Sequence, residues 1–364
     1  MAFDTQTRGD EPHGKTHATA HGAAPGHRSG MVRDLPMERV SAKPAFLRGF
    51  IPTVQDVWAY RELLGQLVRK ELKIKYKDSV LGFFWTLLRP LLMLLVYSIA
   101  IGTFLGNSKN IPEFGVFLYT GLLAWALFTD IIGGCTGTII SNAGLVKKVY
   151  FPRELFPLSV VGAAFINFLL QFVVLIGAYV VTWHPPTFST DLLLVPLAVL
   201  VMVFFAFALG LVLGAVNVYL RDVEYLVEVT LLLWFWMTPI VYDWTKVHNK
   251  MVCQGGNSLA AVRGLQGYNH LPPIGSVKSE NACYITDNHL IHVFQIYLAN
   301  PMANVVLAFQ RALWPGGRTE KGSPFYYSGD LFIRLGVLLG VCVVLVWIAQ
   351  RIFARAQGNF AQEL

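Results

Sequence analysis

Long apolar stretches separated by short basic loops limit what this chain can fold into more than any other feature. Such stretches cover residues 82–105, 161–181, 192–218 and 331–348. A run of about 18 or more apolar residues can cross the hydrocarbon core of a bilayer as a helix. Charged residues make up 14% of the chain, whereas an average soluble domain contains about 25%. We therefore expect an integral membrane protein with an all-helical fold.

The apolar stretches divide into six predicted transmembrane helices. They lie at about 82–105, 114–140, 155–181, 192–218, 225–242 and 331–353. The second contains Gly133, Gly134 and Gly137, and small residues of this kind allow two helices to approach closely. In the first, Pro90 removes a backbone donor and is expected to kink the helix. Residues 79–364 would thus form one transmembrane domain.

The basic residues predict how this domain is oriented. Lysine and arginine gather at 70–77, 147–153, 221 and 351–355, which share one side of the membrane if there are six spans. The positive-inside rule places that side, and both termini, in the cytoplasm. The protein would then be a multi-pass protein of a bacterial cytoplasmic membrane. The same rule explains the formal net charge of +7, so we expect no nucleic-acid partner.

A large insertion, residues 243–330, precedes the last predicted span and would face the outside. Its polar part contains Cys253 and Cys283, which could form a disulfide in an oxidising compartment or remain two free thiols. Its apolar part, residues 289–314, is broken by the Asn-Pro pair at 300–301 into halves too short to span a bilayer. Two short re-entrant helices fit this pattern better than two further full spans, although both preserve the orientation of the last span.

The N-terminal part contains a polar tail and a basic amphipathic segment. Residues 1–44 can bury too little apolar surface to offset chain entropy, so a disordered cytoplasmic tail is expected. Its His13, His17 and His21 would share one side of a helix, but nearby glycines disfavour a helix, so no metal site is predicted. Residues 45–78 predict an amphipathic interfacial helix, with its apolar side in the lipid boundary and its basic side toward anionic headgroups. The alternative is an ordinary helix packed on protein.

Motifs for catalysis are missing from the sequence. There is no phosphate-binding loop of the form G-x-x-x-x-G-K-[ST], no H-E-x-x-H zinc motif and no G-x-S-x-G nucleophile motif. Asp130 is the one carboxylate well inside a predicted span, and an ionisable residue there is a functional candidate. The alternative is a carboxylate near the interface or hydrogen-bonded within the bundle. We expect a protein that catalyses no covalent reaction.

The loop at 141–157 carries the strongest local signal in the sequence. Ser141 or Asn142 could cap a short helix, and Pro152 would end it. The apolar side of this helix would comprise Leu145, Val146 and Val149. A short amphipathic helix held between two spans offers a firm contact for a soluble partner. The alternative is a basic loop that only follows the topology rule.

Four segments, in order along the chain, carry a resemblance to a known family. They are residues 69–82 with Trp85 and Pro90, 145–157, 217–222, and 238–242 followed by Asn300 and Pro301. Together they resemble the membrane subunit of polysaccharide-export ABC transporters, which export lipid-linked O-antigens, teichoic acids, capsules and galactans. The resemblance covers nearly all of residues 55–364. The long tail and the enlarged polar insertion depart from it.

The resemblance implies an ATP-driven exporter assembled from several chains. Two copies of this chain would form the pore, and two copies of a separate ATPase subunit, which binds ATP and Mg²⁺, would dock below them. This chain would need no cofactor of its own. The residues expected to couple to the ATPase are Asn142, Leu145, Lys147, Lys148, Phe151, Pro152, Arg153, Arg221 and Asp222. Asn300 and Pro301 would lie at the external gate.

The resemblance also implies that lipid-linked substrate enters beside the basic segment before the first span. The residues expected at this entrance or in the channel are Arg69, Lys73, Lys75, Tyr76, Trp85, Arg89, Trp125, Trp234 and Trp236. The tryptophans could stack on sugar rings or could serve helix packing. The lysines favour an anionic pyrophosphate lipid. The alternatives are an exporter of drugs or small lipids, a membrane-embedded glycosyltransferase and a scaffold.

Overall fold

The computed structural model describes residues 55, 57–76, 84–104, 106, 111, 113–148, 151–182, 190–244, 297–315 and 331–364. Every regular element in these ranges is a helix, which confirms the predicted all-helical fold. The predicted tail at 1–44 lies outside the described residues, as do Cys253 and Cys283. The structure describes the helical backbone at Tyr76, Trp85 and Arg89 but not their side chains.

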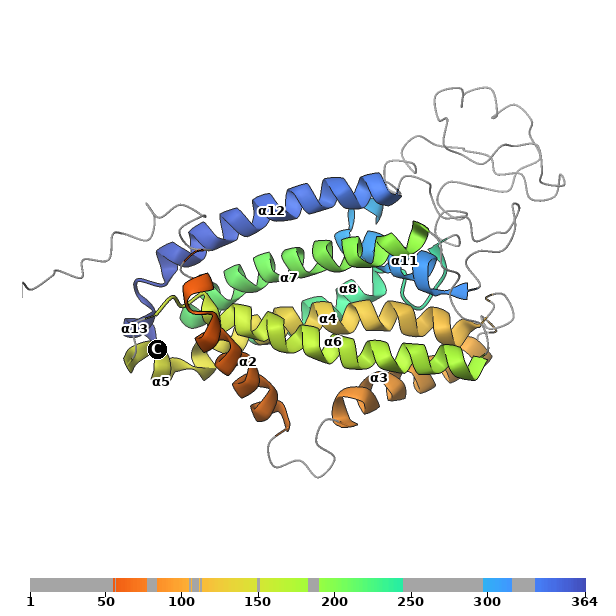
Figure 1. Cartoon of the computed structure of the whole chain (residues 1–364), viewed down its shortest axis with the longest axis horizontal. Coiled ribbons are helices and arrows are strands. Elements are labelled where there is room, and N and C mark those ends of the chain that lie inside the picture. Colours follow the sequence, from red (N-terminus) through yellow and green to blue (C-terminus); the bar gives the residue numbers. More distant parts are fainter. Residues whose placement is uncertain are drawn as a thin grey trace, which may run out of the picture. The chain divides into compact units, whose positions relative to one another are not determined.

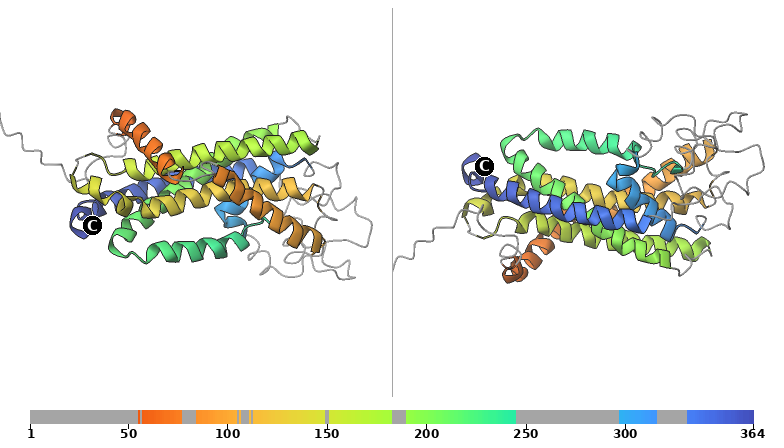
Figure 2. Two further views of the ribbon diagram at one scale, coloured as in Figure 1. Left: turned by 90° about the horizontal axis from the view of Figure 1, so that it is seen from below. Right: turned by 90° about the horizontal axis from the view of Figure 1, so that it is seen from above.

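Four long helices form the body of the bundle (Figure 1). They are α4 (Phe114–Ser141), α6 (Leu155–Thr182), α7 (Leu194–Tyr219) and α12 (Leu331–Ala356). Helix α7 has 26 residues, or about 39 Å of length, which exceeds the roughly 30 Å of a bilayer core. All four are long and apolar enough to cross a membrane, so they match the second, third, fourth and sixth predicted spans. Figure 2 shows them side by side in two further views.

The first predicted span is helical over 84–104 but changes to a π-helix in its second half, and the fifth is shorter in the structure. The first contains α3 (Phe84–Tyr97, 14 residues) and a π-helical segment, η2 (Ser98–Phe104). The fifth contains α8 (Val223–Trp236, 14 residues), which ends shortly before Pro239. A helix of this length covers only about 21 Å, and proline disfavours helical backbone in the residue before it. The count of six spans therefore remains a prediction.

Helix α4 is the most buried of the long helices. In the most apolar part of α4, 78% of the residues are buried, whereas 22% are buried in the most apolar part of α12. Glycines bring α6 and α7 close to it. A Cβ added to Gly134 would lie 2.5 Å from a Val160 methyl, and one added to Gly214 would lie 2.6 Å from the Cys135 carbonyl oxygen. The contact at Gly134 confirms close helix packing at one of the three predicted glycines, whereas a Cβ added to Gly133 would meet no atom within 4 Å.

Helix α2 (Arg61–Tyr76) lies in the predicted interfacial segment 45–78 and packs on α6. Leu67 is only 5% exposed, and a Cβ added to Gly162 of α6 would come within 2.8 Å of Val68. The apolar side of α2 thus faces protein, where the sequence led us to expect lipid. The reason is that Gly162 has no side chain and leaves room for Val68. The sequence of residues 45–78 alone cannot reveal this, because Gly162 lies on another helix. The position of α2 at a membrane interface remains a prediction.

Helix α11 (Pro301–Leu313) begins at the predicted break and is the described part of the expected re-entrant pair. Asn300 caps it by accepting a hydrogen bond from the Met302 backbone N–H at 3.0 Å, and Pro301 occupies the first turn. Eleven of its 13 residues are buried, and it contacts α4, α7 and α12. Helix α11 is therefore held inside the bundle.

Candidate functional site

The predicted functional residues divide between two ends of the bundle. One end, here called the α5 end, contains α5 (Ala143–Lys148) between α4 and α6, and α13 (Phe360–Glu363) after α12 (Figure 1). The other, here called the α11 end, contains α11 and the 3-10 turn η4 (Thr190–Leu193). The residues predicted to contact an ATPase lie at the α5 end, and those predicted for an external gate lie at the α11 end.

Asn142 fixes the start of α5 to α4 and α2. Its side-chain amide donates to the Thr138 carbonyl oxygen at 2.8 Å, and its Oδ1 accepts a hydrogen bond from the Lys70 ammonium. The side chain therefore serves the last turn of α4, where the sequence suggested a cap for α5. The Thr138 carbonyl oxygen also accepts the Asn142 backbone N–H at 3.2 Å and the Ser141 hydroxyl at 3.1 Å, so several donors gather on it where α4 ends.

Helix α5 turns one side toward the bundle and leaves three side chains exposed. Val146 is 5% exposed and belongs to a buried apolar cluster, whereas Leu145 is 37% exposed and Lys147 and Lys148 are exposed as well. The short helix predicted here is confirmed, although Val149 of its predicted apolar side lies outside the described residues. An apolar side chain beside two ammonium groups can bind a complementary protein surface.

Two predicted contact residues that follow α5 point into the bundle instead. The Phe151 ring centroid lies 5.3 Å from that of Phe156. Arg153 donates to the Gln357 carbonyl oxygen, and its guanidinium carbon lies 5.9 Å from the centre of the Phe360 ring. Phe151 and Arg153 therefore support the fold at the α5 end, whatever else they contact.

The remaining predicted contact residues also lie at the α5 end. Arg221 and Asp222 are exposed in the turn between α7 and α8. The Tyr219 hydroxyl donates to the Ala356 carbonyl oxygen at 3.2 Å, which ties this turn to the last residue of α12. Pro152 is half-buried and precedes the first turn of α6. Exposed charge is thus present on two separate connections at this end.

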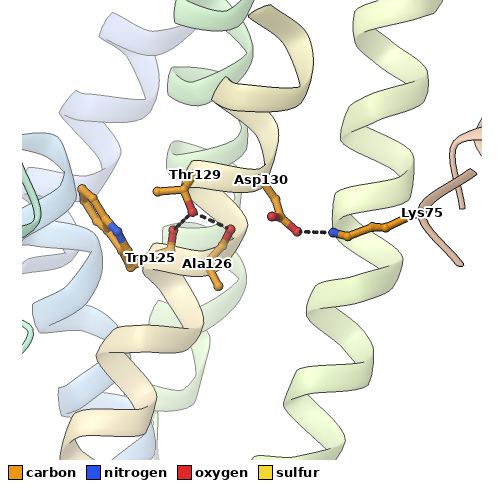
Figure 3. A network of polar contacts seen from close by, with 5 residues as sticks. All are labelled: Lys75, Trp125, Ala126, Thr129 and Asp130. Atoms are coloured by element: carbon orange, nitrogen blue, oxygen red, sulfur yellow. Dashed lines mark hydrogen bonds and ion pairs between the residues drawn. The ribbon is translucent and has the colours of Figure 1, made fainter. Parts of the chain in front are cut away.

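Lys75 of α2 forms an ion pair with Asp130 of α4 (Figure 3). Its Nζ lies 3.1 Å from Oδ2, and the side chains are 44% and 30% exposed. Asp130 is eleven residues from the last residue of α4, or about 16 Å along the helix axis. The adjacent Thr129 hydroxyl donates to the carbonyl oxygens of Trp125 and Ala126. Asp130 is thus bonded to a neighbouring helix, and Lys75 supplies a counter-charge for a carboxylate inside a predicted span. The functional role of Asp130 stays a prediction.

Two of the predicted channel tryptophans are packed among other aromatic rings. Trp125 is 9% exposed, and its ring centroid lies 5.4 Å from that of Phe128 and 5.6 Å from that of Phe235. Trp234 is half-buried and meets Phe128 edge-on at 5.4 Å. Helix packing therefore accounts for both residues. The exposed members of the predicted entrance and channel set are Arg69, Lys73, Lys75 and Trp236.

At the α11 end, Asn300 joins the two separate parts of the fourth segment that carries the family resemblance. Its Oδ1 accepts a hydrogen bond from Trp234 Nε1 at 3.0 Å across 66 residues of sequence, and its Nδ2 lies 3.4 Å from Thr238 Oγ1. Nearby, Gln310 Nε2 donates to the Pro239 carbonyl oxygen at 3.0 Å. The chain after α8 is thus fastened to α11. Sequence reasoning missed Gln310, whose only signal is a polar residue in an apolar stretch.

The described residues contain no group of three His, Cys, Asp or Glu side chains that could hold a metal ion. Cys135 and Cys342, the cysteines within the described ranges, are buried free thiols. His13, His17 and His21 lie outside the described residues.

Comparison with known proteins connects these two ends to a family. Residues 62–251 match the profile of the ABC-2 type transporter family. Over 314 residues the chain is 30% identical to the O-antigen export system permease protein RfbA of Myxococcus xanthus, and the alignment covers 86% of this chain and 100% of that protein. The chain belongs to the ABC-2 type transporter family.

Two further relatives of this ABC-2 family chain have names of the same kind. It is 33% identical over 181 residues to the O-antigen export system permease protein RfbA of Klebsiella pneumoniae, covering 50% of this chain and 69% of that protein. It is 25% identical over 170 residues to the capsule polysaccharide export inner-membrane protein CtrC of Neisseria meningitidis serogroup A, covering 45% and 61%. Membership of this family confirms the resemblance seen in the four segments and agrees with the four apolar helices.

Proposed function

We propose that this ABC-2 family protein is the permease subunit of an ATP-driven exporter that moves a lipid-linked polysaccharide across the cytoplasmic membrane. The observation that carries the proposal is the alignment with an O-antigen export permease over that protein's whole length at 30% identity. A capsule polysaccharide export protein among the relatives supports the same substrate class. These relatives favour a polysaccharide over a drug or a small lipid, and favour transport over glycosyl transfer.

The energy would come from two copies of a separate ATPase subunit, which bind ATP and Mg²⁺. We assign the contact with this partner to the exposed side of α5, which presents Leu145, Lys147 and Lys148. Arg221 and Asp222, exposed at the same end, would form a second contact. This chain would hold no cofactor and catalyse no covalent step. The ATPase would act by binding one conformation of the permease more tightly than the other.

Helix α5 is placed to pass a movement to the long helices. Only Asn142 separates it from α4, and α6 begins at Leu155, soon after it ends. Helix α4 in turn contacts α3, α6, α7, α8 and α11. A displacement of α5 by closing ATPase subunits would therefore reach most of the bundle through α4. We expect a homodimer, with the path for the glycan between its two copies.

The basic side of α2 would receive the anionic headgroup of the lipid carrier. Arg69, Lys73 and Lys75 are exposed there, and a basic residue near an anionic surface contributes about 1 kcal/mol. Because Lys75 is paired with Asp130, an arriving phosphate would compete with that carboxylate for the same ammonium group. Binding of substrate would then loosen α2 from α4.

We place the α5 end, together with both termini, in the cytoplasm. Exposed basic residues gather at this end, and they include Lys147, Lys148, Arg221 and Arg355. At the α11 end the Arg311 guanidinium is paired with Asp191 at 3.0 Å, which offsets its charge. This difference in charge follows the positive-inside rule. In variants without the natural cysteines, we expect a membrane-impermeant maleimide applied to intact cells to modify Leu193→Cys and not Lys148→Cys.

The test of the proposed function is depletion of this protein in its host, followed by analysis of lipid-linked glycans. We expect one long lipid-linked polymer to accumulate on the cytoplasmic side, because synthesis continues while export is blocked. The identity of that polymer would name the substrate. If glycan synthesis itself stops and recycling of the lipid carrier is intact, transport is the wrong function and a synthetic role takes its place.

A further inference from the structure

We propose that Arg153 is a positioning residue, and that it acts with the segment Gln357–Leu364 as a clamp that holds α5 in its orientation for coupling. The inference rests on the proposed function of α5 as the contact for an ATPase. It assigns a role to a segment that the sequence analysis left without one. It also moves Arg153 from the partner-facing set to the supporting structure behind it.

The clamp is built by the chain that follows α12. That chain turns at Gly358, where the Asn359 backbone N–H donates to the Ala356 carbonyl oxygen at 3.1 Å. The turn brings Phe360 back toward the bundle, where it is 0% exposed and lies edge-on to Phe353 at 5.5 Å. A fully buried phenylalanine contributes roughly 1.5–3 kcal/mol relative to an exposed one. The segment is therefore a packed part of the α5 end.

Arg153 connects this segment to the connection between α5 and α6. Its guanidinium donates to the Gln357 carbonyl oxygen, 204 residues away in sequence. The same guanidinium lies 5.9 Å from the centre of the Phe360 ring, within the range of a cation–π interaction. Helix α13 also contacts α5 directly, and Val146 and Phe360 belong to one buried apolar cluster. The C-terminal segment thus contacts α5 directly and also holds Arg153, in the connection that follows α5.

Helix α5 needs such support because it cannot hold itself in place. It has 6 residues, and only Val146 among them is buried. An isolated helix shorter than about 12–15 residues is marginal in water. Its orientation therefore depends on the anchors at its two flanks. Asn142, bonded to Lys70 of α2, is the anchor on the α4 side, and Arg153 is the anchor on the α6 side.

The two anchors have a mechanical consequence. Because Arg153 binds the chain that continues α12, a push on α5 is transmitted to α12 as well as to α4. Without the clamp, α5 would still bind an ATPase through its exposed residues, but it would rotate before it moved the bundle. Loss of the clamp should therefore separate ATP hydrolysis from transport while leaving the complex assembled.

The experiment uses the full chain with its ATPase in liposomes, with Arg153→Met, Phe360→Leu and the double variant. Arg153→Met removes both the hydrogen bond and the cation–π contact, and is expected to lower the glycan exported per ATP hydrolysed by about tenfold. Phe360→Leu removes the cation–π contact and keeps the Gln357 carbonyl acceptor, so its loss should be smaller, about two- to fivefold. The double variant should do no worse than the poorer single variant, because both remove the same contact. Arg153→Lys keeps a cation that can donate to the Gln357 carbonyl oxygen and approach the Phe360 ring, and should keep part of the coupling that Arg153→Met loses.

A structural readout accompanies the transport assay. A nitroxide attached at Gly144→Cys, where an added Cβ meets no atom within 4 Å, reports the mobility of α5 without disturbing its packing. Its mobility should rise in Arg153→Met and in Phe360→Leu. Arg61→Met removes the same charge from an exposed position on α2 and should leave mobility and coupling unchanged.

Three results would overturn the clamp. They are unchanged label mobility, unchanged transport per ATP, or additive losses in the double variant, which would mean that Phe360 acts through packing alone. Failure of the proposed function looks different, because the unmodified chain would then fail to co-purify with an ATPase. The label at residue 144 would still report whether Arg153 holds α5.

Discussion

The α5 end and the α11 end are built in opposite ways. Helix α5 has 6 residues with Val146 alone buried, while α11 has 13 residues of which eleven are buried. Side-chain hydrogen bonds such as that between Trp234 and Asn300 hold α11 itself, whereas on α5 itself Leu145 and Lys148 are exposed. Leaving one buried hydrogen-bonding group unpaired costs about 1–3 kcal/mol. The α11 end therefore resists displacement, and the α5 end can be displaced by a partner.

The difference indicates where force enters the bundle and where it is opposed. A partner that moves α5 works against two anchors, at Asn142 and Arg153, before it reaches the long helices. At the opposite end, Asn300 and Gln310 fasten α11 to the chain after α8. The predicted gate would thus stay closed until those bonds are broken together. Substitutions at the two ends should therefore fail in different assays.

Leu145→Asp should give the largest effect. Leu145 is an exposed apolar residue on α5, so its replacement leaves the fold intact but buries a carboxylate in the proposed interface. An unpaired charge there costs at least about 3 kcal/mol, which weakens ATPase binding about a hundredfold or more. Co-purification of the ATPase with the membrane-inserted variant measures this loss.

The matched control is Leu193→Asp at the α11 end, where the side chain is 64% exposed. It adds the same charge and should leave ATPase binding unchanged. Equal losses from both variants would remove the distinction between the ends. Phe151→Asp would be a poorer test of ATPase binding. The Phe151 ring packs on Phe156, so its loss should reduce the yield of folded protein.

Asn300→Leu should give the next largest effect, and only on stability. It removes the cap of α11, worth about 1 kcal/mol, and leaves the Trp234 N–H without its acceptor, at about 1–3 kcal/mol. Thermal unfolding of the protein in detergent should therefore occur at a lower temperature, while ATPase binding below that temperature is unchanged. Asn300→Asp keeps the oxygen that accepts these hydrogen bonds and should lower the unfolding temperature much less. An unchanged unfolding temperature in Asn300→Leu would show that these hydrogen bonds do not stabilise the protein.

The sequence predicted well what depends on neighbours along the chain. The four long spans follow from runs of apolar residues, and the short helix α5 follows from a pattern of a few residues. The end of α8 was within reach, because Pro239 lies inside the predicted fifth span and disfavours its continuation. Each of these signals is local, so one stretch of sequence contains all that is needed.

Contacts between distant segments could not be predicted in the same way. The resemblance assigned Arg153 to a partner, but its hydrogen-bond acceptor lies 204 residues away in the same chain. Helix α2 was expected to face lipid, but Gly162 gives it a place on α6. Trp234 and Asn300 were both named, yet nothing in either segment shows that they meet. Phe360 lies after the last predicted span, and an aromatic residue there was the only hint of a further packed segment.

Reversal of the Lys75–Asp130 pair should give a smaller effect near the middle of the bundle. Lys75→Glu places two carboxylates together, and Asp130→Lys two ammonium groups, so each should slow export. The combined exchange restores an ion pair and should recover most of the rate, with a coupling energy on the order of 1 kcal/mol because both groups are partly exposed. Export of labelled glycan from vesicles measures all four combinations. Lys73 lies on the exposed side of the same helix, so adding Asp130→Lys to Lys73→Glu should not raise the rate of export.

Lys147→Gln should give the smallest effect and should distinguish the two kinds of contact within α5. Lys147 is exposed, and one surface charge contributes about 0.2–1 kcal/mol, so ATPase binding should weaken by about fivefold at most. The screening length falls from about 8 Å at physiological salt to about 3 Å at 1 M. The difference between Lys147→Gln and the unmodified chain should therefore disappear in 1 M salt, when binding is titrated at both concentrations. Leu145→Ala, which removes apolar area, should keep its effect there. If the lysine variant is equally weak in high salt, Lys147 acts through a fixed, desolvated contact, and the exposed side of α5 is more like the α11 end than its exposure indicates.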